Sequence, residues 1–514
     1  MKSRSLMGLI AVAYACFFVL AGQSQIAAQH EQRQLRRTYY VVKDLGTLGG
    51  TVSVAEGISD RGWIVGSAYL AGDQSEHAYL WRDGVKTDLG TLGGPNSNEQ
   101  WPVKDNRGLI AAVGETSNPD PLGENFCGFN TGLTCLGFLW QDGQKTPLPT
   151  LGGNNGQALG VNNRGQVVGY AENNIQDPNC VAPQVLDVRA VVWGPKAGEI
   201  QQLPPLPGDT ISAATGINDR EQVVGVSGLC SDTTARGVLW QDGTVIDLGN
   251  LGGVLNTIPW AINAQGKVVG QSDITGDATL HAFLWNNGDG MQDLGALPGD
   301  SASLAFGINA NGRVVGGSCV DATLSSCRAF LWQNGVMTDL NTLVKPGSTP
   351  LYLFFGNDIN SRGEIAFFAF NQSNGEYHAA MGVPCDADHA NVEGCEEQST
   401  GADIVPVTSE RPRVILPENV RKQLQQRRHG PMGAYESQTD NVDFLHEQSQ
   451  IDFNSAGAGP QTCRSLGSSC TSSKQCCNNV CGRLTKTCCN PFHNQFCTSY
   501  KDCCSGACIS NRCE

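Results

Sequence analysis

The chain has 514 residues, a formal net charge of −15 and 16% charged residues. This length is too great for one ordinary hydrophobic core unless the sequence repeats. The acidic balance argues against nucleic-acid binding, which requires a basic surface.

The N-terminus predicts a secretory signal peptide over residues 1–28. The basic stretch MKSRS precedes the apolar run LMGLIAVAYACFFVLAG, and Ala21 and Ala28 offer cleavage sites. A retained membrane anchor is the alternative, but no other long apolar run follows, so we expect no membrane span after removal. Removal also takes Cys16 and leaves 20 of the 21 cysteines, an even number. Because exported chains rich in cysteine form disulfides, we expect a secreted or cell-surface protein in an oxidising compartment.

One phrase recurs between residues 38 and 384, with starts near residues 44, 88, 147, 202, 247, 293 and 339. We number these copies repeats 1 to 7. In repeat 6 the parts are DLGALPGD, SLAFGINANGRVVGG and RAFLWQNGVMT. Each copy reads as four short strands, in outline AFGIN, RVVG, HAFLW and MQDLG, separated by turn residues.

The INxxG turn joins the first two strands of each repeat. The side chain at its second position can accept a hydrogen bond from the backbone two residues on. The glycine three residues later suits a left-handed residue that closes a hairpin. Glu221 replaces this glycine in repeat 4, so we expect that hairpin to be strained or differently closed. The second positions are Ser59, Asp105, Asn162, Asn218, Asn263, Asn309 and Asn360.

The phrase HAFLW predicts close packing between repeats. Its second position is always Ala or Gly, which indicates tight packing against a neighbouring sheet. We expect the final Trp to fill space between repeats, with a ligand platform as the alternative. The first-position histidines alternate with arginines, which suggests a polar role at a strand edge. The tryptophans are Trp81, Trp140, Trp193, Trp240, Trp285 and Trp332, and the histidines are His77, His281 and His378.

Four strands per repeat predict an all-β, seven-bladed β-propeller, with a straight solenoid as the competitor. Repeat 7 has a third strand at 378–384 but no fourth, and Gly382 replaces its Trp. The segment TYYVVKDLG, residues 38–46, reads as a fourth strand without the preceding three. Pairing of the two chain ends would complete the last sheet, close a ring and change the packing near Gly382.

The phrases HAFLW, DLGTLGG and GINxxGxVVG, in fixed order over residues 38–384, resemble the HAF-repeat family of exported bacterial proteins. The resemblance implies an extracellular repeat protein of propeller type with no established reaction.

The two faces of such a ring differ. If the first strand is innermost, the INxxG turns and the last hairpins share one face, which we call the turn face. The loops between the second and third strands share the other face with the DLG crossovers, and we call it the loop face. Loop-face segments 115–135 and 170–188 are long, and variable loops on a rigid scaffold are where binding usually occurs.

All six cysteines of the repeats lie in loop-face loops. We expect the local disulfides Cys127–Cys135 and Cys319–Cys327, and a bridge Cys180–Cys230 between neighbouring blades. The loops are also acidic, which suggests a cation or basic-partner site; a solvated acidic surface is the favoured interpretation, because no EF-hand spacing occurs. The acidic candidates for the binding face are Glu115, Asp120, Glu124, Glu172, Asp177, Asp187, Asp232, Asp273, Asp277 and Asp321.

The sequence gives little support for catalysis. It contains no HExxH, no Cys/His metal spacing, no GxSxG and no P-loop, so we predict no catalytic residue, metal or cofactor. An acidic pair for glycoside cleavage cannot be assigned from sequence alone.

Residues 385–462 are predicted to form a linker. Cys385 and Cys395 are expected to bridge, and residues 417–429 read as a short basic helix, either solvated or recognising a partner. The remainder is rich in Gln, Ser and Asn and is typical of a spacer.

The tail carries two sets of six cysteines, over residues 463–488 and 489–513. Such short segments need crosslinks for stability. They resemble two tandem knottin modules and, less specifically, Dickkopf-type cysteine-rich domains. Spacing alone permits 15 pairings for each set. The knottin resemblance implies Cys463–Cys477, Cys470–Cys481, Cys476–Cys488, Cys489–Cys504, Cys497–Cys508 and Cys503–Cys513.

The tail is basic, with six Lys and Arg against two acidic residues, a net charge of +4. Together these features predict a monomeric, exported, non-catalytic binding or scaffold protein for an extracellular protein or polysaccharide. One alternative is a secreted polysaccharide hydrolase with carboxylates on the loop face. Another is an inhibitor or toxin that acts through the tail.

Overall fold

The computed structural model describes residues 38–99, 108–178, 180, 184–230, 234–345, 347–389, 391–395, 414–415, 508–509 and 512–513. The chain divides into two compact units, Met1–Thr439 and Asp440–Glu514. The predicted signal peptide and the predicted helix at 417–429 lie outside the described residues. Within the described ranges, no helix combines the length and the apolar character that crossing a bilayer requires.

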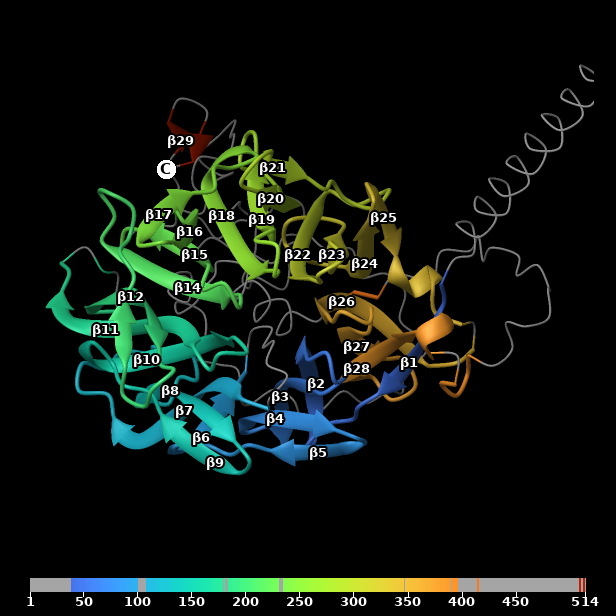
Figure 1. The fold of residues 1–514 in the computed structure, drawn as a ribbon, viewed down its shortest axis with the longest axis horizontal. Helices are drawn as coiled ribbons and strands as arrows, with labels where there is room; N and C mark the ends of the chain where they lie inside the picture. The colour runs from blue at the N-terminus through green and yellow to red at the C-terminus, as the bar shows by residue number, and fades with distance from the viewer. Residues whose placement is uncertain are drawn as a thin grey trace, which may run out of the picture. The chain divides into compact units, whose positions relative to one another are not determined.

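The larger unit consists of antiparallel sheets that follow one another around a common centre, as in a β-propeller (Figure 1). Five of the described sheets have four strands each. In chain order these are β6 (Gly93–Asn98), β7 (Ile110–Pro119), β8 (Leu133–Gln141) and β9 (Gln144–Pro147); β10 (Gly152–Val161), β11 (Val167–Gln176), β12 (Leu186–Trp193) and β13 (Ile200–Gln202); β14 (Ile211–Ile217), β15 (Val223–Gly228), β16 (Arg236–Gln241) and β17 (Thr244–Asp247); β18 (Gly252–Ile262), β19 (Val268–Ile274), β20 (Leu280–Asn286) and β21 (Gly290–Asp293); and β22 (Ala302–Ile308), β23 (Val314–Cys319), β24 (Cys327–Gln333) and β25 (Val336–Asp339).

The two ends of the repeat region meet in one eight-stranded sheet. Its strands are β1 (Tyr40–Asp44), β2 (Gly49–Ile58), β3 (Ile64–Leu70), β4 (Glu76–Arg82), β5 (Val85–Asp88), β26 (Leu351–Ile359), β27 (Ile365–Asn371) and β28 (Glu376–Pro384). β1 runs antiparallel to β28, with Tyr40 opposite Pro384 and Asp44 opposite Ala380. Figure 1 shows the blue N-terminal strand beside the orange β28. The predicted pairing of the chain ends is therefore confirmed.

Short elements complete the described structure. The 3-10 helices η1 (Leu340–Thr342) and η2 (Ala387–His389) flank the closing sheet in sequence. The smaller unit contains the two-stranded pair β29 (Cys508–Ile509) and β30 (Arg512–Cys513).

The glycine of the VVG phrase is required because the second strand crosses close to the first. A Cβ atom on Gly316 would lie 1.9 Å from the carbonyl oxygen of Leu304, a distance that no side chain tolerates. Equivalent glycines meet the first strand at 1.9 to 2.1 Å, and these are Gly66, Gly169, Gly225 and Gly270. The VVG phrase therefore recurs because the same close approach of the first strand excludes a side chain in several repeats.

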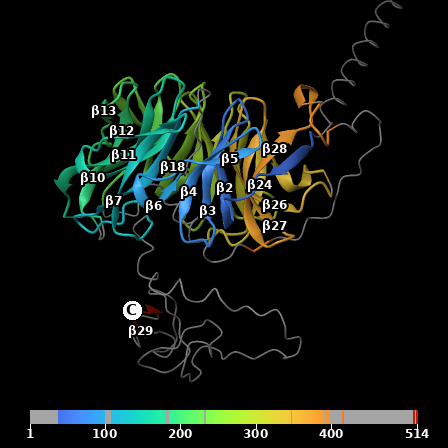
Figure 2. The ribbon, with the colours of Figure 1, turned by 90° about the horizontal axis from the view of Figure 1, so that it is seen from below.

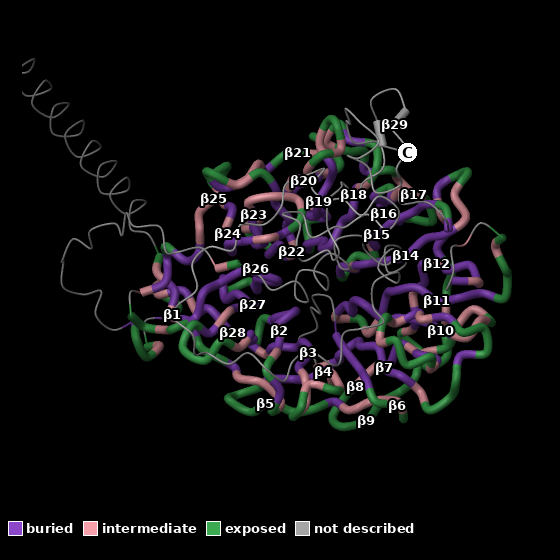
Figure 3. The backbone as a smooth tube through the Cα atoms, turned by 180° about the vertical axis from the view of Figure 1, so that it is seen from behind, coloured by how far each residue is buried: buried purple, intermediate pink, exposed green. Residues whose placement is uncertain are grey.

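The HAFLW tryptophans lie in the apolar layers, as predicted. Trp81, Trp193, Trp240, Trp285 and Trp332 are buried, and Trp140 is half-buried. The indole N–H of Trp193 donates to the Pro149 carbonyl at 2.8 Å, on the crossover that enters the same sheet. Figure 3 shows the buried backbone concentrated in the strands and the exposed backbone at the loops. The five buried indoles fill space between apolar layers, which favours the packing role over a ligand platform, and Trp193 also anchors a crossover.

Repeat 7 lacks the tryptophan because its space is occupied. A Cβ atom on Gly382 would lie 2.6 Å from Phe367 and 3.3 Å from Tyr40, the first residue of β1. Tyr40 is 2% exposed and packs with Val42 and Phe367 in one apolar cluster. The arriving N-terminal strand therefore brings its own aromatic ring, which explains the altered packing predicted for this sheet.

The second-position asparagines of the INxxG turns make two sets of hydrogen bonds. Within a turn, the Oδ1 atom of Asn263 accepts from the amides of Gln265 (3.0 Å) and Lys267 (2.9 Å), and the former bond is the one predicted. The Nδ2 group of Asn263 then donates to the Asn309 carbonyl of the next sheet at 3.1 Å. The same inter-sheet bond runs from Asn162 to Asn218 (3.2 Å), Asn218 to Asn263 (3.0 Å), Asn309 to Asn360 (3.0 Å) and Asn360 to Ser59 (3.0 Å).

Glu221 adopts the left-handed backbone conformation that glycine adopts at the equivalent position of the other repeats. Its φ is +63°, in the left-handed region, and its amide donates to the Asn218 carbonyl at 3.1 Å as in the other turns. The hairpin is therefore closed in the usual way by a strained residue. An ion pair between Glu221 and Arg164, 2.6 Å apart, ties its side chain to the preceding sheet.

The segment 385–395 belongs to the sheet unit, although the sequence suggested that the linker starts at 385. The Cys385 amide donates to the Tyr39 carbonyl at 2.7 Å, and the disulfide Cys385–Cys395 closes the segment. His389, which is 7% exposed, lies 3.6 Å from Glu364. This segment therefore covers the junction at which the ring closes.

The first prediction concerns the inter-sheet amide bond. Asn263→Asp keeps the oxygen that closes the turn but replaces the donor to Asn309 with a buried carboxylate oxygen. We expect the free energy of unfolding in urea to fall by about 1–3 kcal/mol. Asn311→Asp, in the exposed part of the next such turn, should change it by less than about 0.5 kcal/mol. Equal effects of the two variants would contradict an inter-sheet role for the Asn263 amide.

The second prediction concerns ring closure. His378 on β28 donates from Nδ1 to both oxygens of Asp44 on β1 at 2.8 Å, and this bond raises the pKa of His378 although burial opposes it. The same bond lowers the pKa of Asp44, again against burial. Stability from the charged pair is therefore present above pH 3.8 and below pH 6.5, the ordinary values, and is lost as the pH rises through the higher pKa of folded His378.

We accordingly expect His378→Ala to cost roughly 1 kcal/mol of unfolding free energy near pH 5.5, and less near pH 9. The matched variant is His281→Ala, which removes the equivalent pair with Asp293 from inside a single sheet. Hydrogen–deuterium exchange of the β1 amides should increase only in the His378 variant. A β1 strand that exchanges at the wild-type rate in His378→Ala would show that this pair does not hold the closure.

Candidate functional site

The acidic side chains predicted on the loop face are mostly buried, so the expected solvated acidic surface is wrong for them. Asp177, Asp277 and Asp321 are half-buried, and Asp232 lies outside the described residues. The buried members are Glu115, Asp120, Glu124, Glu172, Asp187 and Asp273, none more than 8% exposed.

Three of these carboxylates, Glu115, Glu172 and Asp273, are buried where backbone amides of the first strand point at them. The carboxylate of Glu115 accepts from the amide (3.0 Å) and the side chain (2.8 Å) of Asn96. Asp273 receives the amide of Asn256 at 3.1 Å in the same way. Each acid thus satisfies donors where the first strand departs from regular pairing, as the register shifts in these sheets show. Their role at these positions is structural.

A denser acidic cluster joins the sheets β6–β9 and β10–β13. The Oε1 atom of Glu124 accepts from the Val185 (2.7 Å) and Leu186 (2.9 Å) amides across the sheet boundary. Asp120 accepts from the Asn155 side chain at 2.8 Å, and the same side chain donates to Glu172 at 3.1 Å. We call Asp120, Glu124, Glu172 and their amide donors the acid clasp.

Burial changes the protonation of the acid clasp. It raises the pKa of Glu172 to about 8, since burial removes the carboxyl group from water and Glu124 is a neighbouring acid. It also raises the pKa of Glu124, although the Leu186 and Val185 amides oppose the change. The oxygens of Glu172 face N–H donors from Asn154, Asn155 and Gln184. These neutral donors already engage the Glu172 carboxyl group within the protein.

Disulfides form in the structure at the cysteine pairs predicted for the repeats and for segment 385–395. Cys127–Cys135 closes the β7–β8 loop, and Cys180–Cys230 connects the β11–β12 loop to the β15–β16 loop. The Asp177 carboxylate lies close to this bridge, within 4.8 Å of the Cys180 and Cys230 sulfurs. Because both sulfurs are in a disulfide, this group cannot act as a thiolate metal site.

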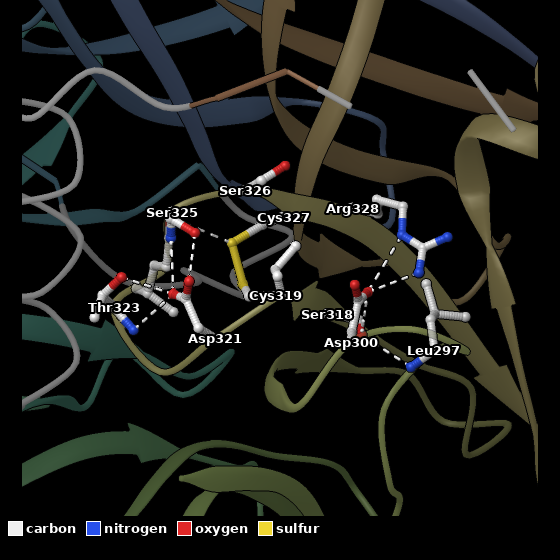
Figure 4. The surroundings of a disulfide bond; sticks show 12 residues. Leu297, Asp300, Ser318, Cys319, Asp321, Thr323, Ser325, Ser326, Cys327 and Arg328 are labelled. Atoms are coloured by element: carbon white, nitrogen blue, oxygen red, sulfur yellow. Dashed lines mark hydrogen bonds and ion pairs between the residues drawn. A yellow bond between two sulfur atoms is a disulfide. The ribbon is translucent and has the colours of Figure 1, made fainter. Parts of the chain in front are cut away.

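The pair Cys319–Cys327 crosses from β23 to β24 at directly opposed positions (Figure 4). Beside it, Asp321 accepts from the amide of Thr323 (3.0 Å) and the hydroxyl of Ser325 (2.6 Å). Burial favours the neutral acid, but hydrogen bonds from Ser325 and Thr323 outweigh it and lower the pKa of Asp321. Its carboxylate shapes this loop and is already engaged by neutral donors.

The first-position residues of HAFLW have the predicted strand-edge role. In addition to His378, His77 contacts the DLG aspartate Asp88 through Nδ1 at 2.8 Å, and His281 contacts Asp293 at 2.9 Å. Arg328 in the equivalent position lies 2.8 Å from Asp300 (Figure 4). It also lies 3.4 Å from Asp339. The partner of each of these side chains is an aspartate in or near a crossover, so they fix crossovers.

On the loop face, contacts link four neighbouring sheets, whose strands run between the two faces (Figure 2). The acid clasp joins the first two, and Cys180–Cys230 joins the second and third. The Ala235 amide donates to the Leu255 carbonyl at 2.9 Å, which joins the third and fourth. We call the described residues of this linked surface, from the β7–β8 loop to the start of β18, the loop platform.

Most of the exposed large apolar side chains among the described residues belong to the loop platform. The described residues include eight large apolar side chains that are exposed, and five belong to this surface. They are Leu122 (38% exposed), Ile175 (53%), Leu229 (37%), Val254 (75%) and Leu255 (38%). Apolar side chains held in water by a rigid scaffold are typical of an interaction surface.

A cavity of about 150 Å³ opens on the opposite face, at the centre of the INxxG turns. The sequence did not predict this cavity. The two aspartates that line it are engaged in hydrogen bonds. Asp60 accepts from the Ser361 amide at 2.8 Å. Asp219 accepts from the backbone amide of Asn163 at 2.8 Å and from the side-chain amide of Asn163 at 2.9 Å. The sequence feature that could have indicated this cavity is the third position of the INxxG turn, which is Asp, Asn or a small residue in the different repeats.

A linker residue contacts the loop face of the β22–β25 sheet. The Ser326 hydroxyl donates to the Val414 carbonyl at 2.9 Å, and Val414 packs on the cluster that contains Cys319, Cys327 and Phe354. Ile415 beside it is 76% exposed. The predicted knottin pairs lie outside the residues whose side chains are described, and they stay predictions.

The third prediction tests this contact. Val414→Asp places a charge on apolar side chains and should loosen the segment by about 1.4 kcal/mol, a tenfold change in its docking equilibrium. Amides of the 323–327 loop should then exchange with deuterium up to about tenfold faster. Ile415→Asp, one residue away and in water, should leave them unchanged. Identical exchange in all three proteins would mean that Val414 does not restrain this loop.

No family model matches the chain, and no curated protein matches its sequence. The β-propeller domain of the Trilobed protease from Pyrococcus furiosus, described as having an open velcro topology, is 11% identical with a TM-score of 0.39, over 56% of this chain and 83% of that chain. TolB from Acinetobacter baumannii is 12% identical with a TM-score of 0.32, over 67% of this chain and 63% of TolB, less than two thirds of its length. A gluconolactonase from Xanthomonas campestris is 9% identical with a TM-score of 0.32, over 68% of this chain and 92% of that chain. Similarity at this level carries no argument about function, so the chain's own geometry must supply one.

Proposed function

We propose that the protein is an exported, non-catalytic binding protein whose seven-bladed propeller presents the loop platform to an extracellular protein or polysaccharide. The observation that carries the proposal is the linked loop platform with its five exposed apolar side chains. A preformed surface loses little conformational entropy on binding, which favours recognition by rigid contact. The signal peptide, the HAF-repeat resemblance and the knottin-like tail belong to the same proposal.

The burial of the loop-face carboxylates favours binding over hydrolysis. Glycoside cleavage needs two carboxyl groups that reach a substrate at a separation of roughly 5–10 Å. On the described loop face, Glu115, Glu124 and Glu172 are at most 1% exposed and accept hydrogen bonds from the protein itself. These acids are enclosed within the protein, while five apolar side chains of the same surface are exposed to solvent.

The fourth prediction tests the platform with a screen of glycans and extracellular proteins against the full chain. Leu122→Asp with Val254→Asp should weaken the selected interaction at least about tenfold, the loss expected from about 1.4 kcal/mol of apolar contact. The matched control is Val85→Asp with Val336→Asp, which changes side chains 63% and 62% exposed beside turn-face hairpins. This control should bind like the wild type.

Three outcomes would redirect the assignment. Loss of binding in the turn-face control would move the site to the other face. Release of a shortened glycan by the wild type would support the hydrolase alternative. Binding that survives both pairs but is lost in Lys501→Glu with Arg512→Glu would assign recognition to the tail.

A further inference from the structure

The loop platform contains one junction that depends on a proton. Glu124 holds the boundary between the β6–β9 and β10–β13 sheets by accepting the Val185 and Leu186 amides on one oxygen. Its other oxygen, Oε2, is buried and has no hydrogen-bond partner among the described residues, in a side chain 1% exposed. A buried carboxylate oxygen without a donor is costly, so this atom requires a proton, an ion or a water.

Glu172 is the group positioned to share that proton. It is fully buried, and its carboxyl group lies within hydrogen-bonding reach of Glu124. Its oxygens accept from the Asn155 amide at 2.9 Å and from the Gln184 side chain at 3.1 Å. These neutral donors stabilise one negative charge but do not cancel two, and two adjacent buried carboxylates cannot both ionise near neutral pH.

No cationic side chain faces the pair among the described residues of the packed elements. Asp120, on the same loop as Glu124, adds a further negative charge, and Tyr170 on β11 is a neutral phenol whose pKa burial raises. Arg189 on β12 lies 2.9 Å from Asp187, and it pairs with Ala171 rather than Glu172 in the strand register. Successive strand residues point to opposite faces, which places Arg189 and Asp187 across the sheet from Glu172.

We propose that Glu124 and Glu172 share one proton, and that its loss opens the acid clasp and loosens the loop platform at alkaline pH. When the shared proton leaves, the two carboxylates repel, and Glu124 is the mobile partner because it lies on a loop. Release of Glu124 frees the Val185 and Leu186 amides. The pKa values of both acids are raised, so the protonated pair stabilises the folded junction. This stabilisation is complete below pH 4.5 and is lost as the pH passes about 8.

The experiment measures hydrogen–deuterium exchange of the Val185 and Leu186 amides in the full chain between pH 6 and pH 9.5, with EDTA present. Rates are divided by the intrinsic rate at each pH, which leaves the protection factor. We expect protection to fall about tenfold per pH unit above the transition, because the ionised fraction of the pair controls opening. Constant protection across this range in the wild type would overturn the proposal without any variant.

Variants identify the proton. Glu172→Gln supplies a permanent N–H donor to Glu124, so protection should become independent of pH. Glu115→Gln changes another buried acid of the same kind and should leave the wild-type transition in place. A transition that persists in Glu172→Gln would overturn the shared proton. Recovery of protection at pH 9 in 1 mM CaCl2 without EDTA would instead assign the clasp to a cation and would also overturn it.

The test does not depend on the proposed function, since it reads backbone protection and not ligand binding. If the platform binds a ligand, the same transition should weaken that binding above pH 8, whereas a failed ligand screen would leave the exchange result unaffected.

Discussion

The fold depends on a carboxamide that serves two neighbouring turns at once. In Asn263 the oxygen closes its own INxxG turn and the nitrogen donates to the carbonyl of Asn309 in the next sheet. No other small side chain offers both an acceptor and a donor at this reach. Repetition of this bond fixes the spacing of the inner strands. Since Asn360 donates to the Ser59 carbonyl, the same bond also connects the last repeat to the first. The residues of the turn face are therefore constrained by the fold, whereas the loop-face loops can differ in length and sequence.

Closure of the ring is the second constraint on the chain. The contacts that close the ring join residues more than 300 positions apart, such as Asp44 and His378. Such contacts form only after a long loop has closed, which slows folding and requires a strong final junction. Three features provide it: the β1–β28 ladder, the Tyr40 ring in the space that Trp occupies elsewhere, and the 385–395 segment that covers both strands. The missing Trp at Gly382 is therefore the clearest trace of closure in the sequence.

Much of this architecture could be predicted because strand alternation and turn chemistry are local. The four strands of each repeat, the end pairing and the cysteine pairs follow from spacing, since equivalent loops of adjacent repeats must be neighbours. The burial of Glu115 and Glu172 could not be predicted, because it depends on amides of another strand that counting charges does not reveal. The second bond of Asn263 was missed for a similar reason, as its acceptor lies 46 residues away. Sequence identified the donors and acceptors but not their distances.

The two faces therefore use different chemistry for the same task of joining sheets. Amides join the turn face, and an amide keeps its charge state at every pH that the protein meets. On the loop face a carboxylate joins two sheets, where Glu124 accepts backbone donors that a neutral side chain would serve less well. An ionised carboxylate accepts hydrogen bonds more strongly than an amide oxygen does, but neighbouring negative charge and burial can prevent the ionisation. Where two acids meet, as at Glu124 and Glu172, a bond of this kind becomes sensitive to the medium. The face with the exposed apolar side chains is thus the one whose geometry can respond to its surroundings.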